Sequence, residues 1–251
     1  MDVFTLLRRN ILWRLHNAFT IIVTILQPML WLVLYSSLAS QVMQGIGIEN
    51  YTAFLLPGLM ILTSFGACSS NGIMNYLMKA DGSFYRILIA PVRRKAIVLG
   101  QLLEAVACTG LEVMIMCIVS LFFSVRVASG LPGILLIALL VCMTAFFLSG
   151  LTYTISLCLP NEVAYETVMN AIALPIFFLS TALLPENSLS GSMALAVDIN
   201  PFTHVINTLR TLVLQENIEI HTVVPTIIML SVMCCISFSW AVHKLKKQTD
   251  L

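Results

Sequence analysis

The side chains best placed to do chemistry in this sequence are four carboxylates inside or beside long apolar segments. Glu104 and Glu112 are eight residues apart and fall on roughly one face of a helix. Glu162 and Glu166 stand at the i, i+4 spacing. A carboxylate in hydrocarbon is costly and usually functional, and proton or ion coupling is the chemistry it would serve. We expect only Glu112 to lie deep, with an inter-helical hydrogen bond favoured over a proton relay, and the other three to be solvated or paired with nearby cations.

The sequence contains none of the common motifs for nucleotide hydrolysis or metal-dependent catalysis. It has no Gly-x-x-x-x-Gly-Lys phosphate loop, no His-Glu-x-x-His pair and no Gly-x-Ser-x-Gly turn. The seven cysteines form no Cys-x-x-Cys pair, and no histidine lies near them with ligand spacing, so buried thiols explain them best. We expect no catalytic residue, metal site or cofactor in this chain. Energy for uphill work would come from a partner or a coupled ion.

The most distinctive segment is basic and separates two apolar stretches. It holds five of the thirteen cations: Lys79, Arg86, Arg93, Arg94 and Lys95. Asp81 or Ser83 can cap a short helix over 81–92. Its apolar residues recur at helical spacing: Phe84, Ile87, Leu88 and Pro91. We interpret this helix as an apolar ridge with cationic shoulders through which a separate motor protein drives the chain. The alternative is a solvated loop whose charges only set topology.

Composition determines the broad class. Hydrophobic residues make up 59% of the 251 residues and charged residues only 10%, and the mean hydropathy is +0.97. A soluble domain carries about 25% charged residues. So few charges cannot cover a globular surface, and lipid must cover it instead. The sequence therefore predicts a polytopic membrane protein with no nucleic-acid partner.

The apolar segments predict an all-α fold with six transmembrane helices in one domain over residues 1–251. A helix needs about 20 residues to cross a bilayer. We place the spans near 18–40, 53–77, 97–124, 131–158, 164–184 and 223–243. The segment 186–221 is too polar to cross. An even number of spans puts both termini on the same side of the membrane.

The distribution of positive charge orients these spans. Under this topology three cations precede the first span, five lie between the second and third, and three follow the last, which makes eleven on one face. Only Arg126 and Arg210 fall on the other face. Cytoplasmic loops carry the excess of Lys and Arg. Both termini are therefore expected in the cytoplasm, with the chain in the cell membrane.

The first sixteen residues have an amphipathic pattern. Phe4, Leu7, Ile11 and Leu15 form a helical stripe beside Trp13 and three arginines. The apolar run that follows is longer than the roughly 7–15 residues of a secretory signal. We therefore favour an interfacial helix over 1–16 on the cytoplasmic leaflet, rather than a cleaved signal peptide.

A second amphipathic helix is predicted inside 186–221. Asn200 followed by Pro201 is a good helix start. Apolar residues then line one face: Phe202, Val205, Ile206, Leu209, Leu212 and Val213. Polar residues line the opposite face: Thr203, Asn207, Thr208 and Thr211. This helix would lie flat on, or dip into, the outer leaflet as an outer gate or substrate exit, or else would simply shield the bundle.

Three motifs resemble the permease subunits of ABC-type exporters of the second export class, which includes drug-resistance, nodulation-factor and polysaccharide or lipid exporters. The first is Gly82-Ser83-Phe84 with Ala90-Pro91-Val92-Arg93 and Gly100-Gln101, similar to the family's coupling helix and third span. The second is Pro175-Ile176-Phe177-Phe178-Leu179-Ser180 with Pro185, and the third is Asn200-Pro201-Phe202-Thr203-His204-Val205 with Leu209-Arg210. Their order and spacing cover nearly the whole chain.

The chain departs from the family pattern at two places. Lys79-Ala80-Asp81 stands where a run like Glu-Arg-Glu is usual, which changes the charges available to grip an ATPase. Thr181 stands where glycine commonly follows the serine of the second motif, so the backbone there is less permissive.

The resemblance implies a half-sized permease that pairs with a second copy and binds two copies of an ATP-binding subunit, where ATP and Mg would bind. The coupling residues would be Gly82, Ser83, Phe84, Tyr85, Arg86, Ile87, Leu88, Pro91 and Arg93. The substrate route would follow the first, second and fifth spans, with Phe65, Asn71, Asn75, Phe177 and Phe178 as candidates. The outer helix would use Asn200, Pro201, Phe202, His204 and Arg210. The apolar interior favours export of a hydrophobic or amphipathic cargo, such as a drug or lipid, with an ion-coupled transporter or channel using Glu112 as the alternative.

Overall fold

The computed structural model describes residues 2–16, 22, 26–34, 51–89, 92–183 and 191–249, and all its regular elements there are helices. They are α1 (Asp2–His16), α3 (Tyr51–Ala80), α4 (Ser83–Ile89), α5 (Arg94–Leu121), α6 (Gly130–Cys158), α7 (Glu162–Phe178), α8 (Ser192–Ile199), α9 (Pro201–Leu214) and α10 (Ile220–Thr249). Residues 26–34 are helical too. The all-α prediction is confirmed for this part of the chain.

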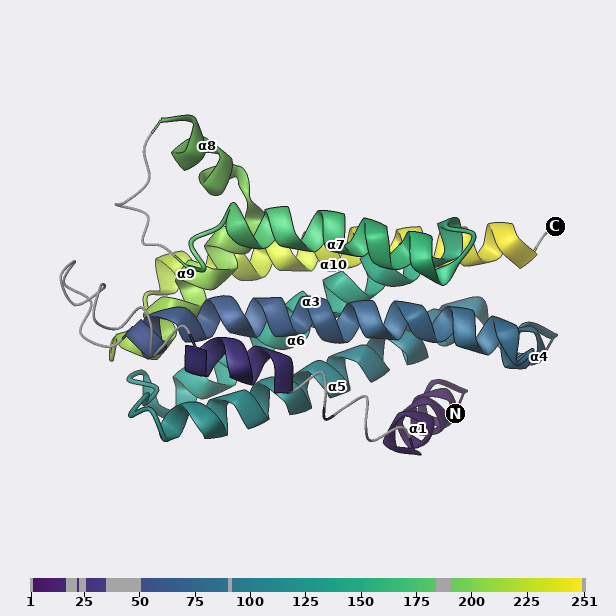
Figure 1. The fold of residues 1–251 in the computed structure, drawn as a ribbon, viewed down its shortest axis with the longest axis horizontal. Coiled ribbons are helices and arrows are strands. Elements are labelled where there is room, and N and C mark those ends of the chain that lie inside the picture. The colour runs from purple at the N-terminus through teal and green to yellow at the C-terminus, as the bar shows by residue number, and fades with distance from the viewer. Residues whose placement is uncertain are drawn as a thin grey trace.

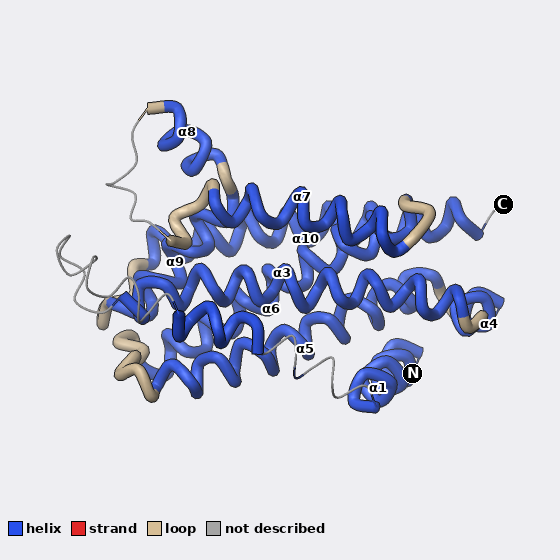
Figure 2. The backbone as a smooth tube through the Cα atoms, viewed as in Figure 1, coloured by secondary structure: helices blue, strands red, loops and turns tan. Residues whose placement is uncertain are grey.

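The long helices run side by side along the longest axis of the molecule (Figure 1). We call the end that holds α1, α4 and the last turns of α10 the α4 end, and the opposite end, with α8 and α9, the α9 end. The described loops between long helices are short and lie at these two ends (Figure 2).

Four described helices are long and apolar enough to cross a membrane: α3, α5, α6 and α10. They correspond to the second, third, fourth and sixth predicted spans and begin within three residues of the expected positions. The fifth prediction, 164–184, coincides with α7, which has 17 residues. Most of the first, 18–40, lies outside the described residues. The count of six spans therefore stays a prediction.

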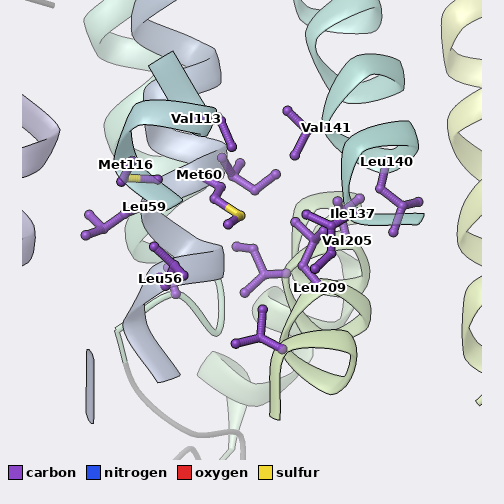
Figure 3. Close-up of a cluster of buried hydrophobic side chains, with 14 of the residues drawn as sticks. Leu56, Leu59, Met60, Val113, Met116, Ile137, Leu140, Val141, Val205 and Leu209 are labelled. Atoms are coloured by element: carbon purple, nitrogen blue, oxygen red, sulfur yellow. The ribbon is translucent and has the colours of Figure 1, made fainter. Parts of the chain in front are cut away.

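Helix α3 occupies the centre of the bundle. In its most apolar window 83% of the residues are buried, against 22% for α10, which lies at the outside. Side chains of α3, α5, α6 and α9 point toward one another in the main core (Figure 3). That core contains Leu56, Leu59, Met60, Val113, Met116, Ile137, Leu140, Val141, Val205 and Leu209.

Small residues let other segments approach α3 closely. A Cβ at Gly58 would lie 2.7 Å from the Cβ of Ala182, which comes just after α7. A Cβ at Gly72 would lie 2.0 Å from the hydroxyl oxygen of Tyr165 on α7. That hydroxyl donates to the carbonyl of Ser69 at 3.0 Å. Small residues at contacts are the usual means of packing helices in lipid, where no hydrophobic effect drives them together.

Helix α9 begins as predicted, because the Asn200 side chain accepts a hydrogen bond from the backbone N–H of Phe202 at 3.0 Å, with Pro201 in the first turn. All six residues of the predicted apolar face are buried. Thr203 and Thr208 on the opposite face are buried too, and the Thr208 hydroxyl lies 2.9 Å from that of Thr226 on α10. Helix α9 is therefore enclosed by α3, α6 and α10 on more than one side, rather than lying flat against them.

We expect Gly72→Ala to destabilise the protein by about 1–3 kcal/mol, the usual cost of overpacking a filled site. The added methyl group would collide with the rigid, buried ring of Tyr165. Gly66→Ala on the same helix is the control, because nothing lies within 4 Å of its added Cβ. Denaturant titration of the purified variants in detergent measures the difference. Equal stabilities would show that α7 does not pack against α3 as described.

Candidate functional site

The basic segment folds into a shorter helix than the predicted 81–92. Gly82 adopts a left-handed conformation with φ of 74°, and the Asp81 carboxylate accepts from the Ser83 backbone N–H at 2.8 Å. Hydrogen bonds from the side chain and the backbone N–H of Ser83 lower the pKa of the Asp81 carboxyl. The turn makes α4 start at Ser83, and it ends at Ile89. Pro91 lies outside the described residues.

The apolar ridge that the sequence predicts on α4 points into this chain instead of outward. Phe84 and Ile87 are buried, and Leu88 is half-buried beside them. Their core contains residues of α3, α5, α6 and α10: Met78, Ile97, Val98, Leu102, Tyr153, Leu157, Ala241, Val242 and Leu245. The physical reason is tertiary packing, because the apolar residues of four other helices at this end of the bundle form one core with this face of α4.

The exposed face of α4 contains different residues. Tyr85 is 59% exposed and Ile89 is 85% exposed. Arg86 lies between them and is exposed, as is Arg93 after the helix. The Arg94 guanidinium donates to the Leu88 carbonyl at 2.7 Å and so closes the C-terminal end of α4. A rigid surface with an aromatic, an aliphatic and two cationic side chains results.

Helix α1 joins this end of the bundle through a chain of buried amides. The Asn10 side chain donates to the Gln101 Oε1 at 3.1 Å. Gln101 in turn donates to the Asn71 Oδ1, and Asn71 donates to the Gln101 backbone carbonyl at 3.0 Å. Gly100 lets α1 approach, since an added Cβ would lie 3.1 Å from the Cβ of Leu6. The amides thus connect α1, α5 and α3.

A groove of about 510 Å³ lies along α3, between α7 and residues 26–34. Phe65, Phe177 and Phe178, three of the five substrate-path candidates, line it. The other two candidates, Asn71 and Asn75, do not line it. Asn71 belongs to the amide chain, and Asn75 donates to the Ser156 hydroxyl of α6 at 2.7 Å. Both face the bundle interior, on the other side of α3.

The carboxylates also differ from expectation. Glu112 is buried, as predicted, but Glu104 is equally buried, with 3% of each side chain exposed. The Cys108 thiol lies 3.7 Å from a Glu104 carboxylate oxygen. Of the two expectations for Glu104, solvation is excluded, because neighbouring helices cover that face of α5, and pairing with a nearby cation stays a prediction. Glu162 is half-exposed and Glu166 exposed, in agreement with their predicted position near a segment end.

At the α9 end, Asn200 connects two helices. Besides capping α9, its side-chain amide donates to the carbonyls of Ile176 and Leu179 at 2.8 and 2.7 Å, at the C-terminal end of α7. The ring of Phe202 lies 5.1 Å from that of Phe65, measured between centroids. The N-terminal end of α9 therefore contacts both walls of the groove.

Arg210 holds the start of α3 against the segment after α7. Its guanidinium donates to the carbonyls of Phe54 and Thr181 and to the Asn207 side chain. It also stacks over the Phe54 ring, 3.7 Å from the centroid. His204 is exposed and makes only a local contact, with its Nε2 3.0 Å from the Asp198 carbonyl.

The described residues thus form a bundle of apolar helices with a partly cationic surface at one end and an apolar groove along its side. The sequence profile of the ABC-2 type transporter family matches residues 1–214. The chain belongs to this family. The whole of α10 lies beyond the matched region.

Curated relatives agree with this assignment. The chain is 26% identical over 212 residues to the "Putative transport permease ycf38" of Porphyra purpurea, covering 83% of this chain and 72% of the relative. The protein of the same name from Cyanophora paradoxa is 25% identical over 218 residues, covering 84% and 73%. That of Pyropia yezoensis is 25% identical over 219 residues, covering 86% and 75%.

Sequence reasoning missed the junction of α1 with α5 and the true outward face of α4. A signal for the first was present, because Asn10 is a polar residue between the apolar positions Leu7 and Ile11 of the amphipathic stripe. For the second there was none, because α4 carries bulky apolar residues on both faces.

We expect Phe84→Ala to lower the unfolding free energy by about 3 kcal/mol, as truncation of a buried aromatic residue does. Tyr85→Ala, next to it but exposed, should change it by less than about 0.5 kcal/mol. Denaturant titration in detergent compares the two. The opposite order would mean that α4 is rotated relative to this description.

Proposed function

We propose that this chain is the membrane subunit of an ATP-driven exporter. A separate ATP-binding subunit, present in two copies, binds ATP and Mg²⁺ and docks on α4, which serves as the coupling helix. The permease pairs with a second copy of itself in the cell membrane, where lipid surrounds it. Both termini face the cytoplasm, together with the α4 end.

The observation that carries this proposal is the combination of burial and exposure in α4. Phe84 and Ile87 fix the helix to four long helices of the bundle. Tyr85 and Ile89 point away from it, beside exposed cations. Aromatic and Arg side chains are enriched among the residues that dominate protein interfaces. A partner bound to this face would push on the whole bundle, because α4 cannot move without disturbing the core beneath it.

The groove along α3 is the candidate substrate path. Its volume falls in the range of small-molecule sites, about 300–1,000 Å³. Phe65, Phe177 and Phe178 give it an apolar wall. Such a wall suits a hydrophobic or amphipathic cargo, drug-like or lipid-like, better than a polysaccharide. Export is the direction of transport that accords with the resemblance of the sequence motifs to exporter permeases.

Ile89→Ala should weaken copurification of the ATP-binding subunit about tenfold, and Tyr85→Ala should act similarly, because a few central side chains supply most of an interface's free energy. The assay captures tagged permease from its host and quantifies proteins that carry an ATP-binding cassette. Ile199→Ala is the matched control, since Ile199 is 80% exposed but lies on α8 at the opposite end. Unchanged capture in both α4 variants, or equal loss with Ile199→Ala, would refute docking on α4.

The proposed orientation predicts a labelling pattern. Cysteine introduced at Tyr85 or at Ser192, both exposed, is tested in a background in which the seven native cysteines are replaced. An impermeant maleimide applied to intact cells should label position 192 and spare position 85, because moving the basic segment outward opposes the charge bias that orients spans. Permeabilised cells, in which both should react, provide the control. Labelling of position 85 in intact cells would contradict a cytoplasmic α4.

A further inference from the structure

The groove along α3 is polar at one end and apolar at the other. Two hydrogen bonds fix α3 and α7 as antiparallel neighbours: Tyr51 donates to the Leu183 carbonyl at 3.2 Å, and Tyr165 donates to the Ser69 carbonyl at 3.0 Å. Toward the α9 end the lining is therefore Leu59 and Leu62 opposite Phe177 and Phe178. Toward the α4 end it is Ser69 and Ser70 opposite Glu166 and Asn170.

The polar end also has a definite charge. Glu166 is exposed there, one helical turn from Asn170 on the same face of α7. None of the described residues that line the groove is Lys, Arg or His. Glu166 is therefore the one charged side chain among the described lining residues, beside an apolar wall that reduces screening by water. A ligand that satisfies both ends is long, has an apolar tail and has a positively charged head.

We propose that the groove selects cationic amphiphiles, with Glu166 as the specificity-determining residue for the charged head. The head lies between Glu166 and Asn170, and the tail extends along α3 toward Phe65 and Phe177. Anionic amphiphiles are rejected by the same carboxylate, since like charges brought together are destabilising. This inference rests on the proposed function, because it assigns a cargo class to the proposed path.

Trp31 also lines the groove and is 40% exposed, which provides a local reporter. The chain has three tryptophans, and replacing the other two, by Trp13→Phe and Trp240→Phe, leaves Trp31 as the single one. The probes share one brominated undecyl chain and carry a trimethylammonium, a hydroxyl or a sulfonate head. Bromine quenches tryptophan fluorescence on contact. Binding is measured with the full-length permease in phosphatidylcholine nanodiscs, with free tryptophan and empty nanodiscs as blanks.

The trimethylammonium probe should quench Trp31 at the lowest concentration of the three. Glu166→Gln should weaken its binding roughly fivefold, as expected for loss of one partly exposed charge pair, and leave the hydroxyl probe unchanged. Glu166→Lys should make the sulfonate probe the tightest binder. Glu162→Gln is the matched control, because it removes a carboxylate one turn earlier on α7 that does not line the groove. It should change nothing.

Equal binding of the three probes to the parent protein, or an equal loss with Glu162→Gln, would overturn the proposal that the groove selects cationic amphiphiles. Occupation of the groove by a second copy of the chain would also overturn this assignment. It would be detected as copper-induced crosslinking through Ile73→Cys together with absence of quenching. The proposed function is tested separately by copurification of the ATP-binding subunit, which does not involve Glu166. A permease that captures this subunit but shows no charge preference would refute the cargo class alone.

Discussion

The central position of α3 is the constraint on which the rest of the structure depends. Unsatisfied polar groups are costly on a helix surrounded by other helices in lipid, and the hydrophobic effect contributes little there, so close packing and internal hydrogen bonds must hold it. Gly58 and Gly72 provide the close packing. Asn71 and Asn75 provide hydrogen bonds to α5 and α6. Every other feature of interest is attached to α3 or lies against it.

The two ends of the molecule are connected through this helix. At the α4 end, Met78 of α3 packs in the same core as Phe84 and Ile87. At the α9 end, Arg210 holds the Phe54 carbonyl, and the Phe202 ring packs against Phe65. The groove lies between these contacts and uses the same helix as its wall. A displacement at either end would therefore change the shape of the groove, because close-packed interiors transmit strain.

The sequence was a good guide to where the long helices lie, since uninterrupted apolar runs and their polar boundaries are direct consequences of the bilayer. The start of α9 was equally predictable, because Asn200 and Pro201 act locally. The direction of each side chain was much harder to predict. Phe84 and Tyr85 are neighbouring aromatic residues, and only the tertiary core decides which is buried. Likewise, the polar side chains of Asn71 and Asn75 suit either a substrate path or an interior hydrogen bond. Only the position of α5 and α6 shows that both residues make interior hydrogen bonds.

The orientation of α4 also explains why so short a helix carries apolar residues on opposite faces. A docking element can pass on a partner's motion only if it is attached to the bundle more firmly than to the loops beside it. A seven-residue helix has no intrinsic stability in water, so tertiary packing must supply it. Phe84 and Ile87 make that attachment, and Arg94 closes the helix end. Tyr85 and Ile89 stay exposed on a helix that the buried face already orders, which gives the preorganised surface that the proposed docking requires.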